Sequence, residues 1–128
     1  MGHIYADIVV KGNKATAKLT RVLVDTGATY TVLPQQVLDE VGAWGPMHEV
    51  EVGLGDNRKI TGKAYGVVIG IEDVEAPTIS IAFEGSQTVI GVETLESLGL
   101  KLDPSTGRME TVRPKGMAYF FLFQASQT

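Results

Sequence analysis

The chain contains no cysteine, only two histidines and no long apolar run. Without cysteine, disulfide frameworks, thiol nucleophiles, iron–sulfur clusters and cysteine-based zinc sites are excluded. His3 and His48 do not belong to any cluster with metal-ligand spacing, so we expect no metal and no other cofactor. The longest apolar run, Ala118–Phe123, is too short to span a bilayer.

Basic residues are also in the minority, because 11 Lys and Arg face 15 Asp and Glu, a formal net charge of −4. No Lys/Arg cluster offsets this acidity, so we expect no nucleic-acid partner. Met1–Asp7 lacks the basic and apolar regions of a signal peptide, which predicts a cytoplasmic protein without a membrane partner. With 44% hydrophobic and 20% charged residues, the 128-residue chain is expected to form one globular domain over residues 1–128.

Glycine and proline, by contrast, are frequent and divide the chain into short β-branched segments. This pattern is typical of an all-β fold. After a first segment with Ile4, Ile8 and Val10, the predicted strands are Ala15–Val24, Tyr30–Leu33, Glu49–Leu54, Lys59–Ile71, Pro77–Phe83, Thr88–Ile90, Leu100–Asp103, Met109–Val112 and Ala118–Phe123.

Two short helices interrupt the predicted strands. The first, Pro34–Val41, begins with a proline and ends before Gly42, and the second, Gly91–Leu98, ends before Gly99. Gly42–Pro46 is expected to be a loop.

The strongest chemical signal surrounds Asp25. Three apolar residues, Val22-Leu23-Val24, deliver this carboxylate to a Thr-Gly turn, and a β-branched strand follows. We expect such an aspartate to be held rigidly and partly shielded from water, which suits acid–base chemistry. Gly27 would let the backbone approach a ligand closely. The simpler interpretation is a solvated turn at a strand end, because Asp-Thr-Gly alone occurs by chance in roughly 2% of chains this long.

The wider context resembles the active-site segment of retropepsin-like aspartic proteases, whose signature is apolar-apolar-Asp-Thr/Ser-Gly-Ala. In that family a flap hairpin follows, and then an apolar-apolar-Gly element that leads into a short helix. Glu49–Tyr65 and Val89-Ile90-Gly91 stand in these places, in the same order. The resemblance extends over roughly Ile4–Val112 and is closest to short stand-alone aspartyl proteases of archaea and bacteria. It implies a single-lobe closed β-barrel or sandwich with a flap hairpin.

The resemblance also implies roles for individual residues. Asp25 would be the catalytic aspartate of an endopeptidase, supported by Thr26 and Gly27. The implied substrate-binding residues are Gly27, Ala28, Thr29, Leu54 and Gly55, and the implied structural psi-loop element is Val89, Ile90 and Gly91. The chain departs from many viral members at Thr29, where they carry Asp, and in its polar flap tip, Asp56-Asn57-Arg58.

Aspartic protease chemistry needs two aspartates, and the chain carries one such motif. Asp103–Gly107 is no second copy, because it contains a proline and lacks an apolar lead-in. A symmetric homodimer acting on an extended polypeptide would supply one Asp25 from each subunit. Two carboxylates about 3 Å apart, at an effective dielectric near 20, would repel by about 5 kcal/mol, so the pair would keep one shared proton in acid. Residues 114–128 would then be a dimer-interface extension.

Three other functions were compared with the residues of the chain. An aspartyl-phosphate enzyme would need a second acid where Gly27 stands, and long helices. A phosphate loop at Gly53-Leu54-Gly55 would need a following helix and a Lys-Ser/Thr pair, which the sequence lacks. The main alternative is a non-catalytic peptide-binding or dimerisation module on the same fold.

Overall fold

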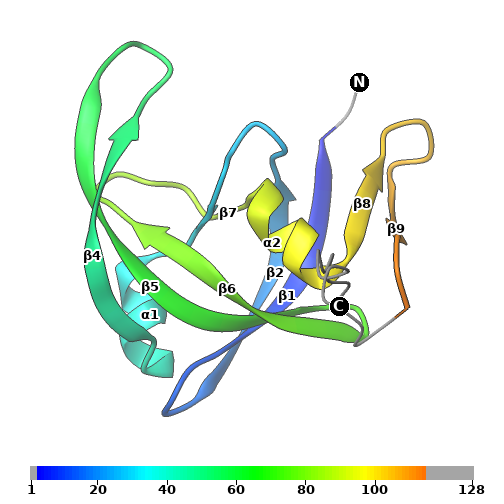
Figure 1. Ribbon diagram of the computed structural model, residues 1–128, viewed down its shortest axis with the longest axis horizontal. Coiled ribbons are helices and arrows are strands. Elements are labelled where there is room, and N and C mark those ends of the chain that lie inside the picture. Colours follow the sequence, from blue (N-terminus) through cyan, green and yellow to red (C-terminus); the bar gives the residue numbers. More distant parts are fainter. Residues whose placement is uncertain (1–2, 115–128) are drawn as a thin grey trace, which may run out of the picture.

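The framework of the protein is a sheet of seven strands, seen in a computed structural model that describes residues 3–114 (Figure 1). Its strands are β1 (Ile4–Lys11), β2 (Thr16–Val24), β3 (Thr31–Val32), β4 (Trp44–Gly53), β5 (Lys59–Ile71), β6 (Val74–Ala82) and β7 (Val89–Ile90). Helix α1 (Gln35–Val41) follows β3, and helix α2 (Val92–Leu98) follows β7. A separate hairpin contains β8 (Leu100–Asp103) and β9 (Arg108–Thr111). The prediction of an all-β fold with short helices is confirmed at this level.

The sheet closes on itself through its longest strand. Its order is β1-β2-β7-β3-β6-β5-β4, and β1 pairs in addition with the end of β5, from Ile8↔Ile71 to Lys11↔Val68. The ring therefore runs from β1 through β2, β7, β3 and β6 to β5 and back. Strand β4 remains outside this ring and pairs with the first half of β5, from Gly53↔Lys59 to Trp44↔Gly66. The β4–β5 hairpin consequently projects from the barrel (Figure 1).

Alternating side chains of the strands fill the interior of the ring. Ile8 and Val10 of β1 and Ile69 and Ile71 of β5 are almost completely buried, while their sequence neighbours point outward. Leucines and valines of both helices join this core, among them Leu38, Val41, Leu95 and Leu98. Burial of one such side chain contributes about 1.5–3 kcal/mol to the stability of the fold. The core as a whole therefore contributes more than the hydrogen bonds of any single turn.

The helices end where glycine permits a left-handed backbone. Gly42 (φ 71°) follows α1 and Gly99 (φ 72°) follows α2, as predicted from their positions in the sequence. The start of α1 differs by one residue from the prediction. Pro34 has an extended backbone and stands at the N-cap, so the first helical residue is Gln35.

The prediction of a loop over Gly42–Pro46 is wrong for its second half. Strand β4 already begins at Trp44, which pairs with Gly66. The register then shifts between Trp44 and His48, and this irregularity accommodates Pro46, which has no backbone N–H to donate. Strand β3 is shorter than predicted, and β6 starts earlier. The predicted strand Ala118–Phe123 and most of the expected interface extension lie outside the described residues.

Candidate functional site

The loop that carries Asp25 is formed around an inserted strand. Strand β7 lies between β2 and β3, parallel to β2 (Leu23↔Val89, Val24↔Ile90) and antiparallel to β3 (Val32↔Val89). Because β2 and β3 are consecutive in the chain, their connection passes around the end of β7. The Asp-Thr-Gly motif and the Val-Ile-Gly element, which are far apart in sequence, therefore lie side by side.

Asp25 itself is fixed by its own turn. Its backbone N–H donates to the carbonyl of Ile90 at 2.9 Å, which continues the β2–β7 pairing by one residue. Its carbonyl accepts the N–H of Ala28 at 3.0 Å, and its side-chain Oδ1 accepts the N–H of Gly27 at 2.9 Å. The turn therefore orients the carboxylate. In the single chain Asp25 is nevertheless exposed, so the expectation that it is partly shielded from water is not met there.

The first amides of α2 hold the rest of this loop. Val92 N–H donates to the carbonyl of Ala28 at 2.8 Å, and Glu93 N–H donates to that of Thr29 at 2.9 Å. Loop and helix approach so closely that a Cβ atom at Gly91 would lie 2.5 Å from the carbonyl carbon and oxygen of Tyr30. Only glycine fits this position, which gives the glycine of the Val-Ile-Gly element a physical reason.

Beneath the loop, four hydroxyl groups form a chain of hydrogen bonds. Thr31 Oγ1 accepts the N–H of Gly91 at 3.0 Å and lies 2.6 Å from Thr94 Oγ1. Thr94 Oγ1 lies 2.8 Å from Thr78 Oγ1, and Thr78 donates to Glu93 Oε1 at 2.6 Å. Ser97 Oγ donates to the other carboxylate oxygen of Glu93 at 3.1 Å.

The carboxylate end sets the direction of this chain. Thr78 has a single hydroxyl proton, and it donates this proton to the Glu93 carboxylate. Thr78 then has no proton left for Thr94, which must therefore donate to Thr78, and Thr31 must donate to Thr94 by the same reasoning. Every hydroxyl proton consequently has one assigned acceptor, and the chain connects β3, β6 and α2 behind the Asp25 loop. This network was not predicted from the sequence.

A cleft of about 870 Å³ separates the Asp25 loop from the β4–β5 hairpin. The loop and the hairpin tip extend from the same end of the barrel, at the top of Figure 1. The cleft brings together most of the predicted site residues, which are Asp25, Gly27, Ala28, Thr29, Leu54, Gly55 and Val89. Ile90 and Gly91 are buried behind the loop, where they hold it rather than line the cleft.

Thr26 lies elsewhere. Thr26 lines a second hollow, of about 570 Å³, with residues of α2, of β8 and of the segment that follows β9, among them Leu95, Leu100 and Val112. The structure thus separates Thr26 from the cleft that its neighbours Asp25 and Gly27 line.

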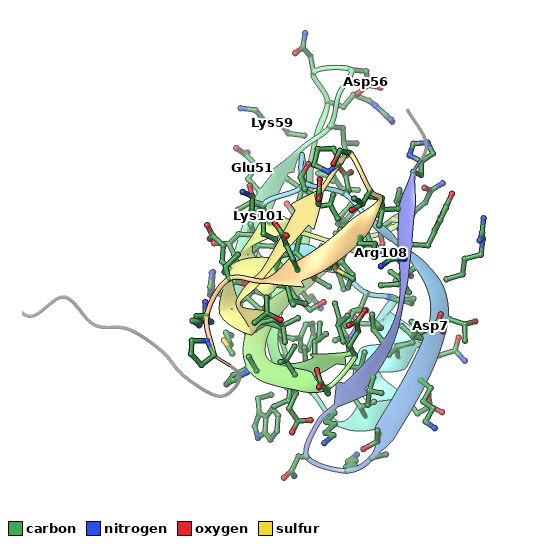
Figure 2. All side chains as sticks on the ribbon, turned by 90° about the vertical axis from the view of Figure 1, so that its right-hand side faces the viewer. Asp7, Glu51, Asp56, Lys59, Lys101 and Arg108 are labelled. Carbon is green, nitrogen blue, oxygen red and sulfur yellow. The ribbon has the colours of Figure 1, made fainter. Side chains whose placement is uncertain are left out.

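The hairpin that covers the cleft carries several exposed charged side chains. Figure 2 shows Asp56 at its tip and Glu51 and Lys59 along its flank. Asp56 forms an ion pair with Arg58 at 2.6 Å, and Glu51 pairs with Lys59 at 3.6 Å. These side chains are well exposed, so each pair contributes about 0–1 kcal/mol at most. A Cβ atom at Gly53 or Gly55 would meet no other atom within 4 Å, so the tip is loosely surrounded.

Many residues of the cleft wall were also not predicted from the sequence. Tyr30, Val32, Val50, Val52, Ile81 and Phe83 give it an apolar lining, and Ser86 and Gln87 add polar groups. Alternation along the strands is the signal that could have found them. Val32 and Ile81 are paired across β3 and β6, so they face the same side of the sheet.

One charged group outside the cleft, the Asp103 carboxyl, has a shifted pKa. Hydrogen bonds from the Ser105 hydroxyl (2.7 Å) and backbone N–H (3.0 Å) lower the pKa of Asp103 below its ordinary value. Within residues 3–114, no three His, Asp or Glu side chains gather into a group that could hold a metal ion. In the same part of the chain, no helix has the length and apolar character needed to cross a membrane.

Neither the sequence models of known protein families nor the curated protein sequences give a match to this chain. The observations that bear on function are therefore the geometry of the cleft and the motif around Asp25.

Proposed function

We propose that this chain is one subunit of a homodimeric aspartic endopeptidase of the retropepsin type. The observation that carries the proposal is the position of Asp25. Its carboxylate stands on a loop that is held by β7 and α2, at the floor of a cleft covered by a hairpin. A fixed acid at the floor of a cleft with an apolar wall suits hydrolysis of a bound polymer.

One chain does not supply both acids of the reaction. Among the described residues that line the cleft, Asp25 and Glu51 carry carboxylates, and Glu51 is paired with Lys59 on the hairpin. A second Asp25 across a twofold axis would complete the pair. The hollow beside Thr26 supports such a contact, because Val112 in its wall is 54% exposed in the single chain.

The proposed reaction follows from two carboxyl groups that share one proton. The ionised Asp25 accepts a proton from water as the oxygen adds to the scissile carbonyl carbon, while the protonated Asp25 transfers its proton to the carbonyl oxygen. The resulting gem-diol collapses as one of its hydroxyl groups returns a proton to the carboxylate that lost one. The C–N bond breaks, and the leaving amine takes up the proton held by the other Asp25, so the pair again shares one proton. Activity therefore falls as rising pH removes the shared proton.

The substrate expected for this cleft is an extended polypeptide with apolar side chains near the scissile bond. Val32, Ile81 and Phe83 face it from the barrel, and Val50 and Val52 from the hairpin. A peptide bound as a strand would present alternate side chains to these two walls.

The decisive test replaces Asp25 with Asn. Asn keeps the shape of the side chain but cannot act as a base, so cleavage of an unfolded protein substrate should fall at least about 10³-fold. In a mixed dimer the site has one aspartate, so excess Asp25→Asn chain should also inhibit the wild type. The measurement is the rate of cleavage at acidic pH, after subunit exchange has been verified by sedimentation.

Two results would contradict the proposal. If exchange takes place and wild-type activity is unchanged, each chain contains a complete site and the symmetric dimer is wrong. A rate that rises steadily through neutral pH would contradict the shared proton. Equal thermal unfolding of both proteins is the control that Asp25→Asn still folds.

A second candidate function is peptide binding without catalysis. It is favoured by one observation: Asp25 Oδ1 already accepts a hydrogen bond from Gly27 in an exposed turn, as a purely structural Asx turn would. This function predicts that wild type and Asp25→Asn bind extended peptides equally and that neither cleaves them.

A further inference from the structure

A second apolar depression lies on the barrel surface next to the cleft. It has a volume of about 380 Å³, and we call it the outer groove. Its main apolar lining comes from Trp44 and Met47 of β4, Val68 of β5, and Pro77 and Ile79 of β6. Glu93 is the one charged side chain among the described residues that line it.

Strand register places the outer groove and the cleft on the same face of the sheet. Directly paired residues point to the same side of a sheet, and so do residues two apart on one strand. Ile81 lines the cleft, and Ile79 lines the outer groove. These two residues are about 7 Å apart along β6, from the rise of an extended strand. The two depressions are therefore successive parts of one surface along β6.

Strand β4 forms the opposite wall of both depressions. Val50 lines the cleft, and Met47 and Trp44, closer to the start of the strand, line the outer groove. Met47 lies over Gly66, because a Cβ atom at Gly66 would come within 2.8 Å of the Met47 Cε atom. The missing side chain of Gly66 thus leaves room for a flexible methionine in the groove.

The side chains of the outer groove have the character of a binding surface. Trp44 is 48% exposed and Met47 is 50% exposed, although both are large and apolar. Tryptophan and methionine are enriched in the contact regions of protein interfaces, and methionine adapts to differently shaped partners. Such a surface suits apolar side chains of variable sequence.

We propose that the outer groove is a distal subsite for the polypeptide that occupies the cleft. An extended chain leaving the cleft along β6 would reach Trp44 and Met47 within about four residues, at roughly 3.3 Å per residue. The groove selects substrates that carry apolar side chains at a distance from the scissile bond. This inference rests on the proposed function, because it assumes that the cleft binds an extended polypeptide.

The kinetic test compares two peptides. A short peptide fills only the cleft, and a long one adds about four apolar residues at each end, the length that reaches the groove. The ratio of kcat/KM for the long peptide to that for the short one should fall about tenfold in Met47→Ala and in Trp44→Ala, as for a contact residue of an interface. Tyr5→Ala, an exposed aromatic on β1, is the control and should keep the ratio. An unchanged ratio in the folded Met47→Ala protein overturns the proposal.

The binding test does not depend on catalysis. Trp44 is the single tryptophan of the chain, so tryptophan fluorescence reports on this one residue of the groove wall. In the inactive Asp25→Asn protein, the long peptide should cause a saturable blue shift of the emission, and the short peptide should cause none. If the long peptide shifts the emission but wild type cleaves nothing, the proposed function fails and the groove stands. If wild type cleaves the short peptide and the long one leaves Trp44 unaffected, the groove fails and the function stands.

The same signal detects other occupants without any peptide. A shift on truncation after Pro114 would show that the chain's own C-terminal segment covers Trp44. A shift with protein concentration would show that a second copy covers it. Either result would overturn the distal subsite.

Discussion

The floor of the cleft is the Asp25 loop, and its roof is the β4–β5 hairpin. These two parts are built in opposite ways. Gly91, behind the floor, is packed so closely that a Cβ atom would meet the Tyr30 backbone at 2.5 Å, whereas a Cβ atom at Gly55, in the roof, would meet nothing within 4 Å. The floor is held by backbone hydrogen bonds to α2, whereas the side-chain ion pairs of the roof are exposed. The same small residue thus serves close packing in one region and freedom of movement in the other.

The two sides of the cleft therefore have different roles in the proposed reaction. A carboxylate that acts as acid or base must be held in position before substrate arrives. A hairpin that admits and releases a polymer must open and close instead. Substitutions on either side of the cleft test this difference.

The largest effect on stability is expected for Gly91→Ala. The added methyl group would collide with backbone atoms of the Asp25 loop, which cannot rotate away as a side chain could. We expect a loss of about 3 kcal/mol in the free energy of unfolding, measured by urea denaturation, together with loss of activity. Gly53→Ala, which meets open space, is the matched control and should stay within about 0.5 kcal/mol of wild type. Equal stability of both variants would refute the packed floor.

A smaller loss is expected for Thr94→Val, which keeps the shape of the side chain. The variant leaves Thr31 without its acceptor and Thr78 without its donor in a buried setting. The expected cost is about 2 kcal/mol in the free energy of unfolding, measured in the same way. Thr20→Val, at an exposed strand position, should cost little. If Thr94→Val is as stable as wild type, the hydroxyl chain does not support the floor.

The roof should respond in activity rather than in stability. Gly55→Val stiffens the hairpin tip but meets no neighbouring atom, so the unfolding free energy should change by less than about 0.5 kcal/mol. Turnover of an unfolded protein substrate should fall, because the tip must move as substrate enters and product leaves. A variant that cleaves as fast as wild type would show that the hairpin is no flap.

The smallest effect is expected in the β8–β9 turn, away from both sides of the cleft. Hydrogen bonds from Ser105 lower the pKa of Asp103 below its ordinary value of 3.8, so they stabilise the fold above that pH, and this contribution disappears as pH falls through the lowered value. Ser105→Ala should therefore have a slightly lower melting temperature than wild type at neutral pH. The difference should vanish in strong acid, and a difference that is independent of pH would contradict the assignment.

Local signals in the sequence were sufficient for part of this structure. The helix ends at Gly42 and Gly99 follow from single glycines, and the turn at Asp103–Gly107 follows from its composition. The Asp25 loop was found because an apolar strand, a turn and a second strand are contiguous in the chain. Signals of this kind depend on neighbouring residues, so the sequence displays them directly.

Other features depend on contacts between distant segments and could not be predicted. Nothing in the local sequence distinguishes Thr31, Thr78 and Thr94 from other strand and helix residues. Their hydroxyl groups come together only because β3, β6 and α2 pack against one another. Trp44 was assigned to a loop because glycine and proline follow it, and the register shift in β4 that tolerates them is visible only in the paired sheet. The separation of Thr26 from the cleft likewise depends on where α2, β8 and the segment after β9 pack.

The position of β7 between β2 and β3 has a consequence for synthesis. A ribosome releases the chain from its N-terminus, so β2 and β3 emerge long before Val89 and Ile90, which fill the space between them. The amides of Val92 and Glu93 that hold the Asp25 loop emerge later still. Domains generally fold as units once their residues are available. A growing chain therefore carries its aspartate unpositioned, and the floor of the cleft can form only after most of the domain has been made.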